Sequence, residues 1–120
     1  ILHQLHQWSA EVFELLTESR RARFAYAEKV AKSREELRPV LLAWLSLWRD
    51  VMLAAGGADA PLSNLEFESQ IRCLAEAIGW SKVRACVAGL EQALVQLDAN
   101  VNIRLLTENV LLDWPRQSAI

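Results

Sequence analysis

A long helical pattern that is apolar almost all the way round is the feature that most constrains this chain. Ser33 and Glu36 form an S-x-x-E capping box, in which each side chain pairs with a free amide of the first helical turn. The pattern ends at Gly56 and Gly57, since glycine readily adopts the positive φ that closes a helix. Between residues 40 and 48 nearly every side is apolar. We therefore expect a central helix that other helices surround.

Helical periodicity continues over the rest of the chain and predicts an all-α fold, a compact bundle of five to six helices. Apolar residues recur at three- and four-residue spacing, and short connections favour antiparallel neighbours. Ser63 and Ser81 are the predicted N-caps of the fourth and fifth segments, while Asn100 ends the fifth and Asn102 begins the sixth. The expected segments run at about residues 2–18, 20–32, 33–55, 66–78, 81–99 and 103–113.

The length and composition fit one helical domain that also has apolar surface for a partner. A chain of 120 residues is the size of a single domain, and an apolar fraction of 52% lies at the upper edge for a soluble protein. Because Ile1 falls inside a helical pattern, we expect residues 1–120 to be a domain of a longer protein whose upstream module is absent here.

The residues that carry chemistry do not form a catalytic or ligand-binding pattern. The sequence has no phosphate-binding loop of the GxxxxGK[ST] or GxGxxG type. His3 and His6 share a helical face but fall short of the three or four ligands that zinc needs. Cys73 and Cys86 have no CxxC spacing, which suits a reducing cytoplasm. We therefore expect no enzyme activity, cofactor, metal, small-molecule substrate or membrane span.

A basic run at residues 20–38 leaves two interpretations open. It holds seven basic and three acidic side chains, a local net charge of +4, in a chain whose net charge is −2. The run could follow DNA phosphates, or it could be a solvated helical face. The interleaved glutamates favour the solvated face. Its first helix is expected to bury a stripe of Ala22, Tyr26 and Val30.

The tryptophans divide into two groups. Trp44 and Trp48 lie one turn apart in the central pattern, so they belong to the core. Trp8, Trp80 and Trp114 lie at the edges of the expected helices. Large aromatic side chains at such edges either anchor a contact with another protein or close the ends of the bundle, and the sequence favours neither interpretation.

Two segments resemble a known family. The stretch from Asn100 to Leu112, Asn-Val-Asn-Ile-Arg-Leu-Leu-Thr-Glu-Asn-Val-Leu-Leu, resembles the last helix of bacterial clamp-loader collar domains, in which Asn-x-Asn-Pro-Arg-Leu-x-Leu-Glu is typical. The stretch from Trp44 to Leu53 resembles the central collar helix of delta-prime subunits. The resemblance covers about residues 37–115. Ile103 departs from the usual proline, and Thr107 replaces a more usual apolar residue.

The resemblance implies a C-terminal oligomerisation (collar) domain of a DNA polymerase III clamp loader, most similar to that of the delta-prime subunit. Such a domain joins other clamp-loader subunits in a ring, while an upstream AAA+ module belongs to the ATP-dependent machinery that loads the sliding clamp onto primed DNA. Delta-prime subunits often lack a working phosphate loop, whereas the gamma/tau paralogue, a second alternative, hydrolyses ATP. The candidate packing or interface residues are Trp44, Trp48, Arg49, Asp50, Asn100, Asn102, Arg104, Glu108, Trp8, Trp80 and Trp114.

An alternative from another class also fits the pattern. A helical effector-binding or dimerisation domain of a transcription regulator is likewise all-α and rich in tryptophan. An upstream helix-turn-helix or a deep apolar pocket between helices would favour it.

Overall fold

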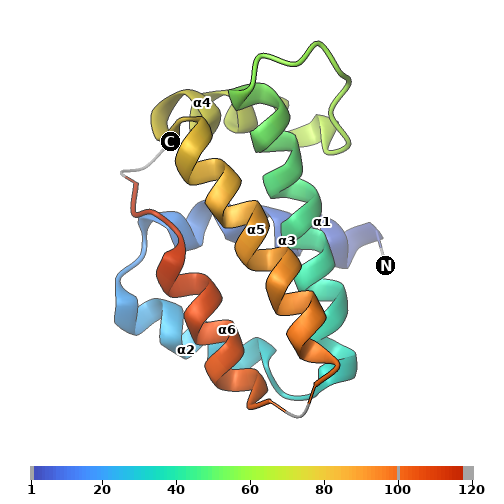
Figure 1. Ribbon diagram of the computed structural model, residues 1–120, viewed down its shortest axis with the longest axis vertical. Coiled ribbons are helices and arrows are strands. Elements are labelled where there is room, and N and C mark those ends of the chain that lie inside the picture. The colour runs from blue at the N-terminus through green and yellow to red at the C-terminus, as the bar shows by residue number, and fades with distance from the viewer. Residues whose placement is uncertain (1, 100, 118–120) are drawn as a thin grey trace.

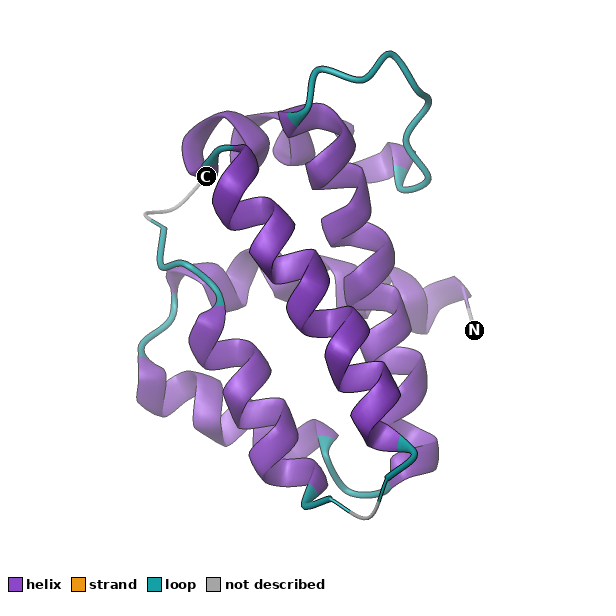
Figure 2. Cartoon of the chain, in the orientation of Figure 1, coloured by secondary structure: helices purple, strands orange, loops and turns teal. Residues whose placement is uncertain are grey.

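The computed structural model describes residues 2–99 and 101–117, and every regular element in that part of the chain is a helix, as the periodicity predicted (Figures 1 and 2). All six α-helices lie within two residues of the expected bounds, and a short 3-10 turn, η1, precedes the fourth. In chain order the elements are α1 (Leu2–Thr17), α2 (Arg20–Val30), α3 (Arg34–Ala55), η1 (Leu65–Phe67), α4 (Glu68–Ile78), α5 (Trp80–Leu97) and α6 (Ile103–Asp113).

Helix α3 is the centre of the bundle, as its apolar pattern predicted. It packs against α1, α2, α4 and α5, and it continues unbroken through Pro39. Trp44 and Trp48 are fully buried. Ten of its side chains are buried in all, which explains why apolar residues occupy nearly every side of its middle.

Helices α5 and α6 lie side by side at the front of the view in Figure 1. Helix α5 lies along α3, and α6 packs against both α5 and α2. Helix α1 crosses behind α3, so the central helix is covered on opposite sides by elements from the two ends of the chain.

Of the predicted serine caps, the one at Ser33 is correct. The Ser33 hydroxyl accepts a hydrogen bond from the amide of Glu36 at 3.1 Å. The predictions for Ser63 and Ser81 are wrong. Helix α5 begins at Trp80, directly after Gly79 at φ 88°, so Ser81 already lies inside its first turn. Ser63 precedes η1 and uses its own amide as a donor to a carboxylate of α3.

Candidate subunit interface

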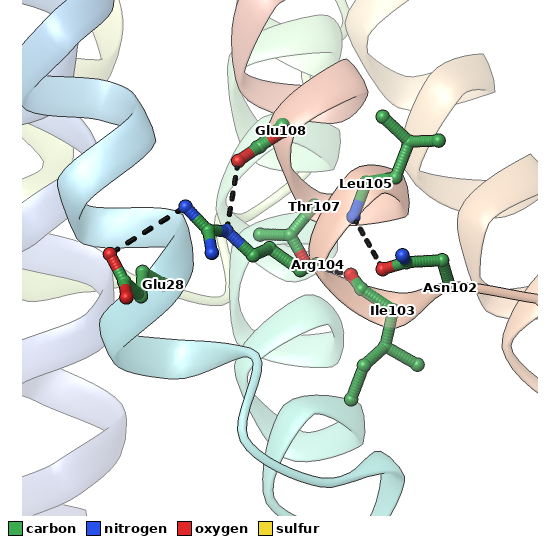
Figure 3. Close-up of polar contacts among 7 residues, drawn as sticks. All are labelled: Glu28, Asn102, Ile103, Arg104, Leu105, Thr107 and Glu108. Atoms are coloured by element: carbon green, nitrogen blue, oxygen red, sulfur yellow. Dashed lines mark hydrogen bonds and ion pairs between the residues drawn. The ribbon is translucent and has the colours of Figure 1, made fainter.

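The start of α6 is fixed by Asn102 (Figure 3). Its side-chain oxygen accepts a hydrogen bond from the amide of Leu105 at 3.1 Å, which is the predicted N-cap. The Thr107 hydroxyl donates to the Ile103 carbonyl at 2.8 Å, so a polar residue is accommodated in the buried face of the helix. Asn100, the predicted end of the preceding helix, lies outside the described residues.

Arg104 links α6 to α2. Its guanidinium lies 3.2 Å from the Glu108 carboxylate one turn along the same helix and 3.6 Å from the carboxylate of Glu28 on α2 (Figure 3). The Arg104 and Glu28 side chains are more than half exposed. Ion pairs of this kind contribute less than about 1 kcal/mol each, so the contact orients the two helices more than it stabilises them.

Three of the five tryptophans form one buried cluster. The ring of Trp114 lies 5.1 Å from that of Trp44, edge to face, and 5.6 Å from that of Trp48. Trp114 is only 3% exposed, so of its two predicted roles the structure favours closing the bundle. Among the described residues, the buried indole N–H groups of these three side chains have no hydrogen-bond partner. In this conformation none of the three presents a surface to another subunit.

Asp50 is a buried residue that organises the loop after α3. Its carboxylate accepts hydrogen bonds from the Ser63 amide at 3.0 Å, and from the amide and the side chain of Asn64, both at 2.7 Å. Asn64 also donates to the Ser46 hydroxyl at 3.3 Å. Since Asp50 is 2% exposed, these donors replace the water that a buried carboxylate loses.

Arg49 and Trp80, in contrast, are exposed where α3 and α5 meet. Arg49 pairs with Glu91 on α5 at 3.0 Å, and both side chains are about half exposed. Trp80 is 47% exposed and lies across Gly56. A Cβ atom at position 56 would be 2.8 Å from the Trp80 ring, so the glycine allows the ring to lie close to the end of α3.

Trp8 lies apart from the other candidates. It is partly buried and lines a groove of about 430 Å³ between α1, α2 and the start of α3, together with Lys29, Glu36 and Pro39. The structure thus divides the candidates. It buries Trp44, Trp48, Asp50 and Trp114, and it leaves Arg49, Trp80, Arg104 and part of Trp8 at the surface.

The sequence interpretation missed the role of Arg23, a buried side chain with many hydrogen bonds to the backbone. It is 4% exposed, and its guanidinium donates to five backbone carbonyls within 3.3 Å. These carbonyls lie at the ends of α1 and α6, where the helix dipoles are negative. Burial, and then the neighbouring Arg116, lower the pKa of Arg23. The five acceptors are those of Leu15, Leu16, Leu111, Trp114 and Pro115.

Two other arginines of the basic run bind neighbouring elements at the surface, and Arg23 is buried, so the interpretation as a solvated face is only partly right. Arg34 donates to the carbonyls of Leu97, Ala99 and Val101, which close the end of α5 and lead to α6. Arg38 pairs with Asp98. The remaining bases of the run are exposed: Arg20, Arg21, Lys29 and Lys32.

The two cysteines differ in their surroundings. Cys73 is exposed, although its position beside an apolar stripe suggested burial, whereas Cys86 is buried against the α6 side of α5. Burial, and then the charge of Asp113, raise the pKa of Cys86 to about 12. Its thiol is therefore protonated near neutral pH, which does not suit a nucleophile.

Neither a membrane-crossing helix nor a cluster of metal ligands occurs within residues 2–99 and 101–117. No helix there combines the length and apolar character that a membrane crossing requires. No three histidine, cysteine or acidic side chains in that part of the chain gather so that they could hold a metal ion.

Comparison with known families gives one match, and it spans nearly the whole chain. Residues 3–116 match the family described as DNA polymerase III, delta subunit, C terminal. No curated protein matches the chain, and no solved structure does. The match agrees with the resemblance to clamp-loader C-terminal domains, and it does not support the alternative of a transcription regulator.

Proposed function

The chain belongs to the family of C-terminal domains of DNA polymerase III delta subunits, a family of non-catalytic clamp-loader components, and from this premise we propose that it joins one subunit to its neighbours. In this proposal residues 1–120 form a single collar domain. An AAA+ module upstream belongs to the ATP-dependent complex, which loads the sliding clamp onto primed DNA in the cytoplasm. The family match over residues 3–116 is the observation that carries the proposal.

The distribution of side chains supports a role in binding. Several groups with reactive or charged chemistry are used inside the fold, among them Arg23 and Asp50. Large hydrophobic side chains, in contrast, remain at the surface on several separate elements, and a partner that docks on one face covers those of that face. They are Leu5, Phe24, Leu42, Leu65, Trp80, Val95, Leu105 and Leu112.

We also propose that the parent subunit is delta-prime. The support is the helix from Trp44 to Leu53, which resembles the central collar helix of delta-prime subunits. The full-length subunit should then hydrolyse no ATP by itself, measured as phosphate release. Hydrolysis that depends on a phosphate-loop lysine upstream would identify the gamma/tau paralogue instead.

We further propose that the basic run does not serve DNA. Arg23, Arg34 and Arg38 are engaged with carbonyls or with Asp98, which leaves a smaller positive surface than the sequence suggested. Changing Arg20, Arg21 and Lys32 to alanine should leave DNA binding by the assembled clamp loader unchanged in a salt titration. A reduced salt dependence would contradict this.

Reconstitution tests the central proposal. The full-length subunit, mixed with the other clamp-loader subunits from the same source, should form a stoichiometric complex by size-exclusion chromatography with light scattering. Deleting residues 1–120 should abolish assembly, while the upstream module alone should remain folded by circular dichroism. A complex that assembles and loads clamps without these residues would contradict the proposal.

A further inference from the structure

The line along which α3 and α5 pack has a regular surface, which we call the α3–α5 seam. Helices α3 and α5 lie side by side in Figure 1. The seam consists of the stripe Arg38–Leu42–Arg49 on α3 and the stripe Trp80–Glu91–Val95 on α5, which continues to Asp98 at the C-cap of α5. Within each stripe the residues are separated by three, four, seven or eleven positions, which places them on one face of a helix.

Two ion pairs show how the stripes are aligned. Arg38 pairs with Asp98 near one end of the seam, and Arg49 pairs with Glu91 closer to its middle. Leu42 follows Arg38 by one turn, and Val95 lies between Glu91 and Asp98, so antiparallel packing brings Leu42 beside Val95. On α5, Glu91 and Asp98 thus flank Val95, while on α3 Arg38 precedes Leu42 by one turn and Arg49 follows it by two.

The apolar part of the seam is exposed to an unusual degree. Val95 is 72% exposed and Leu42 is 50% exposed, and Trp80 continues the line at 47%. Three of the large exposed hydrophobic side chains therefore share one seam. Others lie on separate elements, such as Leu5 on α1, Phe24 on α2 and Leu65 on η1. An apolar centre with a charged rim is the usual anatomy of a protein interface.

The charges indicate what kind of partner fits. Around Leu42 and Val95 the bases Arg38 and Arg49 lie on the α3 side, and the acids Glu91 and Asp98 lie on the α5 side. Arg84, an exposed base of α5, lies nearer Trp80 and outside this segment. All four side chains are 42–70% exposed, so they remain open to a partner. A helix laid along the seam is complementary when its apolar stripe has acids toward α3 and bases toward α5.

We propose that the α3–α5 seam is the docking surface for the C-terminal helical domain of another clamp-loader subunit, which presents one amphipathic helix with this charge order. The proposal rests on the proposed function and adds to it which face binds and what the partner helix carries. Leu42, Val95 and Trp80 supply the apolar contact, and the two ion pairs orient the partner.

Aspartate substitutions on the seam test the docking surface. In the full-length subunit, Leu42→Asp with Val95→Asp should weaken binding to the other clamp-loader subunits at least about 100-fold, since each lost central contact accounts for about tenfold. The matched control is Leu105→Asp with Leu112→Asp on α6, at positions 54% and 37% exposed. The control should change binding less than about twofold.

A charge exchange separates recognition from folding. The variant R49E with E91R retains an ion pair between α3 and α5 but reverses the charges that the partner meets. It should melt like the unchanged protein and still bind about tenfold more weakly. Binding at full strength would overturn the charge order that we infer.

The remaining outcomes distinguish this proposal from the proposed function. Loss of binding in the α6 control with normal binding by the seam variant would overturn the seam and leave the proposed function intact. Failure of the unchanged subunit to bind any other clamp-loader subunit would overturn both. Self-association that the seam substitutions abolish, without binding to other subunits, would identify a second copy of this chain as the occupant and overturn the proposed partner.

Discussion

Arg23 and Arg49 show how one residue type serves two regions of the molecule. Arg23 is buried between α1, α2 and α6, where it donates only to backbone carbonyls. Arg49 lies on the α3–α5 seam and pairs with Glu91 while both remain half exposed. A buried hydrogen bond is costly to lose because no water replaces the missing partner. An exposed ion pair contributes little, because water solvates both charges. We infer that the first region holds the fold together and that the second remains available for binding.

Removing the buried guanidinium should have the largest effect on stability. Arg23→Met keeps most of the apolar stem but leaves five carbonyls without their donor. It should lower the free energy of unfolding by about 3–5 kcal/mol, measured by urea denaturation followed by circular dichroism. Arg21→Met, exposed on the same helix, should cost less than about 0.5 kcal/mol. Equal effects of the two substitutions would remove the contrast between the regions.

The features that could be predicted from the sequence are local. The serine cap at residue 33 and the asparagine cap at residue 102 each fix a helix end through neighbouring backbone groups. Apolar residues on nearly every side of the central helical pattern predicted that α3 is buried, because a helix can bury all its sides only when other helices surround it.

The features that could not be predicted depend on distant contacts. The α2 stripe was expected at Ala22, Tyr26 and Val30, which the structure buries only in part, while Arg23 and Ala27 are buried. An arginine has no apolar signal, so its burial follows only from its hydrogen bonds to the carbonyls of α1 and α6. Likewise, no local signal connects Asp50 with the loop 13 residues later.

Removing the Asp50 carboxylate should have the second largest effect on the free energy of unfolding. Asp50→Ala leaves two backbone amides and the Asn64 side chain without an acceptor near the end of α3. The free energy of unfolding should fall by about 2–3 kcal/mol, and amide exchange at Ser63 and Asn64 should quicken. Asp59→Ala, in the exposed part of the same loop, is the matched control. Unchanged exchange at Ser63 would show that the loop holds its shape without the carboxylate.

A pH titration tests whether burial raises the pKa of Cys86, which lies near Arg23. The pKa of Cys86 is about 12 in the folded protein, and a free thiol ionises near 8.5. Between these values the folded state binds more protons, so its stability is full below about pH 8.5 and falls as the pH rises. The expected loss between pH 8.5 and 10 approaches ~1.4 kcal/mol per pH unit. Cys86→Ala should remove this slope below about pH 9, where Tyr26, whose pKa burial also raises, does not yet contribute. A slope that persists there in urea titrations would place its origin elsewhere.

The smallest stability effect is expected at the seam. A double-mutant cycle with Arg49→Ala and Glu91→Ala should give a coupling of less than about 1 kcal/mol, because water solvates both charges. A coupling above about 2 kcal/mol would mean that the pair ties α3 to α5 as Arg23 ties α1 to α6, and that it is not free to meet a partner. A small coupling, together with weakened binding to the other subunits by either single variant, would show that these charges act between molecules and contribute little to the fold.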